Sequence, residues 1–229
     1  MFGDTFGLDF SGKATVLVNG RLPTTLDGLC LYVNNVRAPL FFLSSTQINF
    51  QVPEVPSSGT VGVQVAQFCG APNELRSSIE SVTVSLATPE FFYFKRNPDG
   101  KNPIAAINAV NGNRIGSPGL IPGANFVPAA PGDILTLFFT GGGSTNPMFA
   151  PGELSGTAAS VTGLVAITIG GTQLDPVDVL YIGVAPGFAG LYQLNLRVPA
   201  GTQAGNQPVV LNIGNSASPA GYLFVGTGN

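Results

Sequence analysis

Short runs in which apolar and polar residues alternate recur along the whole chain, and helical periodicity is hard to find. Alternation of this kind, rich in β-branched and aromatic residues and interrupted by Gly, Pro and Asn, is typical of strands in a β-sandwich. The pattern therefore predicts an all-β protein. The predicted strands are Ala14–Val18, Leu29–Val33, Gln47–Val52, Thr60–Ala66, Ser81–Leu86, Ile134–Phe139, Val165–Ile169, Tyr192–Val198, Val209–Ile213 and Gly221–Val225.

The chain also contains an internal repeat. The segment 47–53 reads QINFQVP, and residues 193–199 read QLNLRVP. In both copies a glycine follows the proline, Gly59 in the first and Gly205 in the second, and introduces an alternating strand. A repeat of this length predicts two related modules in tandem.

Turns and an earlier strand extend the repeat upstream. The predicted strand at 29–33 ends in Asn34-Asn35 and the one at 165–169 ends in Gly170-Gly171, both dipeptides that tolerate positive φ. The sequence of residues 12–18 is similar to that of residues 132–138. The predicted organisation is an N-terminal arm at 1–11, a β-sandwich at 12–88, a Pro/Gly-rich connector with a hairpin at 89–129, and a second β-sandwich at 130–229.

The run APLFFLSSTQINFQVP at residues 38–53 resembles the hallmark of the Solibacter-type C-terminal module, an uncharacterised family at the ends of many secreted acidobacterial proteins. Later segments follow the order of that family: 88–92, 105–112, 128–132 and 185–193. The resemblance implies two tandem immunoglobulin-like domains and a secreted or cell-surface location, and it assigns no site residues. Family members usually end a longer protein, whereas this chain consists almost entirely of the module, so we expect the module to be the whole product here.

Composition excludes some classes of protein. Only 21 of 229 residues are charged, or 9%, against about 25% in an ordinary soluble domain. With 44% hydrophobic residues the chain is unlike a disordered one, and nine Lys and Arg residues are too few for a nucleic-acid interface. A net charge of -3 does little to keep copies apart, so the composition favours association.

The termini and the cysteines give information on the cellular compartment of the protein. No apolar run approaches the 18 or more residues of a membrane helix, so we expect no membrane span. The N-terminus lacks the basic flank and apolar stretch of a signal peptide, so the chain is either cytosolic or a mature, processed form. Cys30 and Cys69, the only cysteines, either form a disulfide or are two unpaired buried thiols.

Catalytic chemistry is not predicted. Without histidine the chain cannot form a Ser-His-Asp or Cys-His arrangement or a histidine-ligated metal site. The glycine run 141–143 precedes Ser144 without the lysine of a phosphate-binding loop, so we interpret it as a flexible turn. We expect no enzyme activity, no cofactor and no bound metal.

A few polar clusters have two interpretations each. Asp175 and Asp178 are either turn residues or paired carboxylates, and residues 97–102 are either a turn or a fragment of a calcium loop. The basic cluster of Lys95, Arg96 and Lys101 fits a solvated hairpin tip. In each case ordinary turn chemistry is the simpler interpretation.

Asn49 and Asn195 occupy the same place in the repeated strand. Alternation places Asn49 on a polar row with Gln47 and Gln51, opposite the apolar face. Repetition in both modules favours a structural role, such as hydrogen bonds to a neighbouring loop. A sugar-binding polar row is the alternative.

The N-terminal arm offers a contact for assembly. Phe6, Leu8 and Phe10 alternate with small or polar residues, as in a half-apolar strand. This strand either forms an edge of its own module or is donated to the sheet of another copy. The second interpretation leads to our main hypothesis, a structural subunit of a bacterial fibre whose partners are other copies of itself. The alternative is a monomeric, adhesin-like or carbohydrate-binding module on the cell surface.

Overall fold

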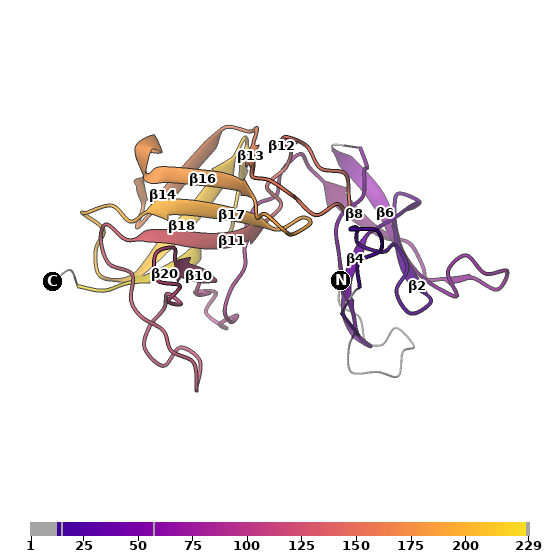
Figure 1. Ribbon diagram of the computed structural model, residues 1–229, viewed down its shortest axis with the longest axis horizontal. Helices are drawn as coiled ribbons and strands as arrows, with labels where there is room; N and C mark the ends of the chain where they lie inside the picture. The colour runs from indigo at the N-terminus through magenta and orange to yellow at the C-terminus, as the bar shows by residue number, and fades with distance from the viewer. Residues whose placement is uncertain (1–12, 15, 57, 228–229) are drawn as a thin grey trace. The chain divides into compact units, whose positions relative to one another are not determined.

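β-Strands make up nearly all the regular structure in residues 13–14, 16–56 and 58–227, the part of the chain that the computed structural model describes (Figure 1). The helical structure in these ranges is a single 3-10 turn, η1 (Pro176–Asp178). The prediction of an all-β protein is confirmed. Two compact units divide the chain: unit 1 (Met1–Leu86, Phe149–Thr157, Pro186–Gly190) and unit 2 (Ala87–Met148, Ala158–Ala185, Leu191–Asn229).

Unit 1 contains two antiparallel sheets. One has the strand order β1-β4-β5; the other has the order β3-β2-β6-β7, with β8 also paired to β6. The strands are β1 (Lys13–Ala14), β2 (Leu29–Val33), β3 (Val36–Arg37), β4 (Leu40–Leu43), β5 (Ile48–Phe50), β6 (Gly59–Gln67), β7 (Leu75–Arg76) and β8 (Glu80–Val84).

The two sheets of unit 1 share one hydrophobic core. Alternate residues of β6 are buried, and they meet Leu40, Leu43 and Ile48 from the other sheet. Strand β2 is buried along its whole length because its second face carries Cys30 and Tyr32, which pack with Ala66. The arrangement is sandwich-like, as the alternating pattern predicted.

Unit 2 also contains two antiparallel sheets. The first has the order β10-β11-β17-β16-β13-β12, with β9 paired to β11; the second has the order β15-β14-β18-β19, with β20 paired to β18. The strands are β9 (Glu90–Phe91), β10 (Ala106–Asn108), β11 (Ile134–Thr140), β12 (Thr145–Asn146), β13 (Ala159–Val161), β14 (Val165–Ile169), β15 (Thr172–Gln173), β16 (Val179–Val184), β17 (Tyr192–Arg197), β18 (Gly205–Ile213), β19 (Ser216–Ala217) and β20 (Gly221–Val225).

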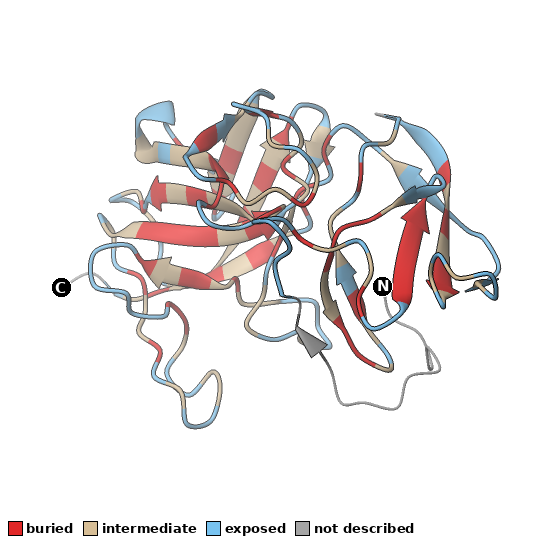
Figure 2. Ribbon diagram, turned by 45° about the vertical axis from the view of Figure 1, so that its right-hand side comes forward, coloured by how far each residue is buried: buried red, intermediate tan, exposed pale blue. Residues whose placement is uncertain are grey.

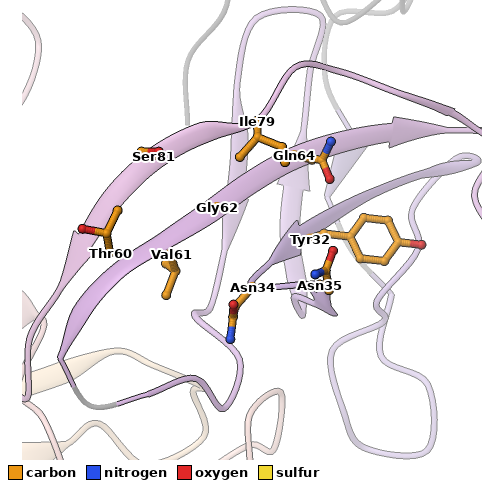
Figure 3. Close-up of a pocket in the computed structure, with 9 residues that line it drawn as sticks. All are labelled: Tyr32, Asn34, Asn35, Thr60, Val61, Gly62, Gln64, Ile79 and Ser81. Atoms are coloured by element: carbon orange, nitrogen blue, oxygen red, sulfur yellow. The ribbon is translucent and has the colours of Figure 1, made fainter.

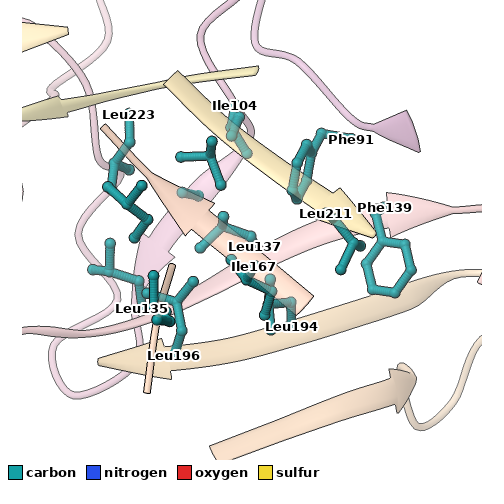
Figure 4. Packing of buried hydrophobic residues seen from close by; sticks show 14 of the residues in the cluster. Phe91, Ile104, Leu135, Leu137, Phe139, Ile167, Leu194, Leu196, Leu211 and Leu223 are labelled. Carbon is teal, nitrogen blue, oxygen red and sulfur yellow. The ribbon is translucent and has the colours of Figure 1, made fainter. Parts of the chain in front are cut away.

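The core of unit 2 lies between these two sheets (Figure 4). Leu135, Leu137 and Phe139 of β11 are fully buried, as are Leu194 and Leu196 of β17. Residues of β14, β18 and β20 cover them from the second sheet. Unit 2 is therefore sandwich-like as well.

The internal repeat of the sequence corresponds to equivalent strands in the two units. Strands β2 to β8 of unit 1 match β14 to β20 of unit 2 in order and in pairing. In both units the second matched strand follows a tight turn with positive φ, at Asn34-Asn35 and at Gly170-Gly171. The long strands β6 and β18 both begin at a glycine with positive φ, Gly59 and Gly205.

The proposed match between residues 12–18 and 132–138 does not hold in the described part of that segment. Strand β1 is limited to Lys13–Ala14 and pairs with β4. Strand β11 instead pairs with β17, the equivalent of β5. Strand β1 therefore lies beside β4 as β13 lies beside β16. The sequence match was misleading because local alternation does not specify which strand becomes the neighbour.

The boundaries of the units also differ from the predicted ones. Residues 89–129, predicted as a connector, belong to unit 2, where they form β9 and β10 and bury Ile104, Ile115 and Ala129 in its core. Their many prolines and glycines mark tight turns between short core-forming pieces. Residues 149–157 join unit 1, where the Gly152 N–H donates to Gln51 Oε1 at 2.7 Å and the Gly152 oxygen accepts from Leu22 N at 2.8 Å.

Candidate functional site

The first candidate site is the outer edge of β8 in unit 1. Strand β8 pairs with β6 from Gly59↔Val84 to Val63↔Glu80. Among residues 13–14, 16–56 and 58–227, no strand pairs with its other side. Residues 80–83 are exposed (Figure 2). The strand therefore presents a bare edge of the kind that can pair with another chain.

Backbone groups of β8 point outward from this edge. Asn34 N donates to the Gly62 oxygen at 2.8 Å, so Gly62 of β6 directs its backbone toward β2. The next residue, Val61, then directs its backbone toward β8, because bonding sides alternate along a strand. Val61 pairs with Val82 of β8, and the residues on either side of Val82 are Ser81 and Thr83. Their N–H and C=O groups face away from β6.

Apolar side chains accompany the open edge. Val82 lies opposite buried Val61, on the core-facing side of the sheet, yet 40% of its surface is exposed. Val84 packs against the core and is half-buried. Leu86, just beyond the strand, is 73% exposed. The core of unit 1 is thus incompletely covered along β8.

The second candidate site is a shallow depression in the same sheet, on the face that points away from the core (Figure 3). Its volume is about 280 Å³, and its nine lining residues are uncharged: Tyr32, Asn34, Asn35, Thr60, Val61, Gly62, Gln64, Ile79 and Ser81. Gly62 leaves room here, because a Cβ atom at that position would lie 2.7 Å from Ile79 Cγ2. Amide and hydroxyl groups around an apolar floor suit a neutral, polar ligand.

The Tyr32 ring points away from the other lining side chains and is engaged elsewhere (Figure 3). Arg76 Cζ lies 4.0 Å from the ring centroid, and Arg37 Nε donates to Tyr32 Oη at 3.2 Å. Glu74 Oε1 accepts from Arg76 Nε at 2.8 Å, and Glu74 Oε2 accepts from Gly70 N at 2.7 Å. This network holds the loop between β6 and β7, so the Tyr32 ring is no stacking platform for a sugar.

The two cysteines lie beside this network. The structure joins Cys30, buried in β2, to Cys69, which follows β6, in a disulfide with a Cα–Cα distance of 5.9 Å. The Tyr32 hydroxyl lies 3.9 Å from Cys69 Sγ. The disulfide and the Tyr32 network therefore fasten the same loop to the outer face of the sheet.

The ionisation of Glu74 couples this loop to pH. The Gly70 N–H hydrogen bond lowers the pKa of Glu74 below its ordinary value of 4.5, and the ion pair with Arg76 lowers it further. A depressed carboxyl pKa stabilises the fold above the ordinary value, and this contribution is lost as pH falls through the lower, folded-state pKa. We expect Glu74→Gln to weaken the acid sensitivity of unit 1. Amide hydrogen exchange in residues 68–77, compared at neutral pH and at about pH 3, measures the effect. Equal acid sensitivity in both proteins would contradict it.

The two aspartates singled out from the sequence have separate structural partners. Asp175 caps η1, where its Oδ1 accepts from Val177 N at 3.0 Å. Asp178 Oδ1 lies 3.6 Å from Arg197 Nε. Turn chemistry and an ion pair account for both carboxylates, so the arrangement does not favour a pair that acts together on a substrate.

Residues 97–102 form a closed turn. Asn97 Nδ2 donates to the Lys101 oxygen at 2.6 Å, and Asp99 Oδ1 accepts from Lys101 N at 3.0 Å. Nearby, Arg96 pairs with Glu90 at 3.0 Å. Within the described part of the chain, no three His, Cys, Asp or Glu side chains gather as metal ligands.

The glycine run at 141–143 is closely packed, unlike the flexible turn predicted for it. A Cβ atom on Gly141 would lie 1.9 Å from the Thr88 oxygen, and one on Gly142 would lie 2.4 Å from the Tyr192 ring. The Tyr192 hydroxyl donates to the Gly143 oxygen, and burial raises the pKa of this phenol above its usual range. Glycine is needed here for close approach of the backbone.

The repeated asparagines differ in their surroundings. Asn195 lies between β11 and β16, and its Oδ1 accepts from the buried Thr136 hydroxyl at 2.9 Å. Asn49 Oδ1 accepts at 2.6 Å from Gln47 Nε2, just before β5, in an exposed pair. Gln51, not Asn49, makes the loop contact predicted for this polar row, because its Oε1 accepts a hydrogen bond from Gly152 N.

Asn195 and Asn49 provide a matched pair of variants. Asn195→Ala leaves the buried Thr136 hydroxyl without its acceptor, so we expect the free energy of unfolding to fall by about 1–3 kcal/mol. Asn49→Ala removes an exposed bond, and we expect a change within about 0.5 kcal/mol. Chemical denaturation measures both variants. Equal losses would contradict the structural role of Asn195.

Phe6, Leu8 and Phe10, the residues of the predicted assembly strand, lie outside the described residues. Sequence reasoning missed both the edge of β8 and the depression. The strand Ser81–Leu86 was predicted, but alternation does not reveal that its outer side lacks a neighbour. The polar residues of the depression showed only as the polar positions of alternating strands.

Searches with the sequence found no matching family model and no matching curated protein. The resemblance noted from the sequence therefore stays a prediction. No helix in residues 13–14, 16–56 and 58–227 is long and apolar enough to span a membrane.

Proposed function

We propose that the protein is a structural subunit of a bacterial extracellular fibre, built from two immunoglobulin-like sandwiches. Copies join head-to-tail when the N-terminal strand of one copy adds to a sheet of the next. The observation that supports this function is the bare edge of β8, where Ser81 and Thr83 direct backbone groups outward and Val82 is partly uncovered. An added strand would satisfy those groups and cover that side chain.

The apolar side chains of the arm can contribute burial energy to such a contact. Burial of Phe6, Leu8 and Phe10 contributes roughly 1.5–3 kcal/mol for each side chain. The sum, about 5–9 kcal/mol, is available to offset the loss of freedom on association. Because the donating and accepting surfaces differ, each added copy presents a new acceptor, and the contact propagates into a filament.

Charge and the disulfide agree with this function. The net charge of -3 over 229 residues gives weak repulsion between copies. A disulfide between Cys30 and Cys69 suits an oxidising compartment such as the cell surface. These two features support an extracellular, self-associating protein, and the family resemblance implies the extracellular location.

Deletion of residues 1–11 tests the proposal. Negative-stain images of the full chain should contain filaments, and the truncated protein should remain a soluble monomer of the same fold by circular dichroism. A truncated protein that still polymerises would exclude donation of the N-terminal strand. A full chain that stays monomeric at every accessible concentration would exclude the fibre.

A second candidate function is a monomeric, cell-surface module that binds carbohydrate. The depression supports it, because uncharged amides and hydroxyls such as Asn35, Gln64 and Ser81 surround an apolar floor. Its test is retention of the purified monomer on an array of neutral oligosaccharides, with Asn35→Ala as the variant that should lose retention. An array without bound protein would dispose of this function.

A further inference from the structure

In unit 2, the strand edge that corresponds to the bare edge of β8 is the outer edge of β20, and this edge is covered. Gly205↔Val225 in unit 2 corresponds to Gly59↔Val84 in unit 1, so β20 is the counterpart of β8. The outer side of β20 is covered by chain of its own unit. Two parallel bridges, Pro103↔Tyr222 and Ala129↔Val225, join it to the segment that precedes β11.

The covering residues use defined backbone atoms. Ile104 N donates to the Tyr222 oxygen at 3.0 Å, and Tyr222 N donates to the Asn102 oxygen at 2.9 Å. Farther along, Ala129 N donates to the Phe224 oxygen at 2.9 Å. By the register of the two hairpins, Tyr222 and Phe224 correspond to Ser81 and Thr83. The backbone groups that face outward from β8 therefore correspond to the groups through which β20 binds its covering segment.

Side-chain burial differs in parallel with the cover. Leu223 and Val225 of β20 are each 1% exposed, and Ile104 from the covering segment is also 1% exposed. Their counterparts in β8 are Val82, which is 40% exposed, and the half-buried Val84. Both strands thus carry apolar residues at the same two positions, and only β20 has them enclosed. At these two positions β8 carries the apolar residues that a cover encloses in β20, whereas at the start of the strand Glu80 takes the place of buried Gly221.

We propose that residues 1–11 of a second copy form this cover and run parallel to β8, as residues 102–104 run parallel to β20. Phe6, Leu8 and Phe10 alternate as Asn102, Ile104 and Ala106 do, so Leu8 takes the place of Ile104 and lies against Val82. This assignment rests on the proposed fibre and adds its acceptor strand, direction and register.

The length and composition of the arm fit this acceptor. Eleven residues span up to roughly 36 Å when extended, more than the length of the five-residue strand β8. The arm contributes three large apolar side chains on one face, and β8 offers Val82 and Val84 beside exposed Leu86 on its uncovered side. The other edge strands of this sheet, β3 and β7, are each only two residues long and offer shorter ladders.

Disulfide trapping between copies tests the register. Leu8→Cys in one tagged chain and Val82→Cys in a differently tagged chain are mixed under filament-forming conditions and oxidised. We expect about tenfold more cross-linked heterodimer than in a control mixture of Leu8→Cys with Val36→Cys on β3, since a disulfide needs Cβ atoms about 4 Å apart. Val36 is 43% exposed, close to the 40% of Val82, so reactivity is matched.

Each outcome decides a separate point. Filaments without the Val82 cross-link, or with an equal Val36 cross-link, would overturn β8 as the acceptor while leaving the fibre in place. Closure within one chain, seen when both cysteines are put in a single dilute copy, would show that the arm covers its own β8 and overturn the second copy as occupant. An absence of filaments from the unmodified chain would overturn the fibre and this inference together.

Discussion

Val82→Lys is expected to raise the concentration at which filaments form by about 100-fold, which corresponds to roughly 3 kcal/mol. In the single copy Val82 is 40% exposed, so a lysine can extend along the sheet and keep its ammonium group in water. In the proposed contact the same position is covered by the arm of the next copy, and the charge would lose its water. Pelleting assays across a concentration series measure the shift.

Val110→Lys is the matched control. Val110 is 81% exposed and belongs to unit 2, so the substitution adds the same charge on an exposed valine that is not part of β8. We expect the control to form filaments near the concentration of the unmodified chain, apart from the small effect of one charge. Unaltered assembly of Val82→Lys, or equal losses in both variants, would show that the edge of β8 is not the contact.

Strands that lie between strong turn signals were predicted with accurate bounds. β2, β14 and β20 coincide with the predicted Leu29–Val33, Val165–Ile169 and Gly221–Val225. Each has β-branched or aromatic residues and ends at a turn or loop that breaks the strand. In such segments local preference and the final fold agree.

Two central strands, β4 and β16, were missed. β4 reads LFFL and β16 reads VLYIGV, so neither separates a polar from an apolar face. Both are central in their sheets, and β16 is flanked by β13 and β17. Their place depends on partners that are distant in the sequence, and period-2 patterns carry no information on those partners.

The candidate site was the least predictable part of the structure. Val82 and Leu223 are both apolar residues at the same position of equivalent hairpins, yet one is exposed and the other is enclosed. The difference arises because the segment of residues 102–129 covers β20. A strand's own residues do not report whether such a cover exists, so an open edge becomes visible only in the folded chain.

Removal of the disulfide by Cys30→Ala with Cys69→Ala is expected to lower the free energy of unfolding of unit 1 by about 4 kcal/mol in the chain-entropy model. The sequence separation of 39 residues sets this magnitude. Unit 1 has little reserve, because its main core cluster holds eleven buried residues among those described, against twenty in unit 2. Alanine suits the vacated strand position, since Ala166 of β14 is the counterpart of Cys30.

Hydrogen exchange resolves the effect by unit, because β2 and β6 report on unit 1 while β14 and β18 report on unit 2. Protection should fall in β2 and β6 by the equivalent of the lost stability and stay unchanged in β14 and β18. The unmodified chain under a reducing agent should show the same loss. Equal loss in both units would mean that they unfold as one body, and no loss would mean that the Tyr32 network holds the loop without the disulfide. In the expected case the disulfide makes up for the small core of unit 1, the unit whose sheet edge is open to a second copy.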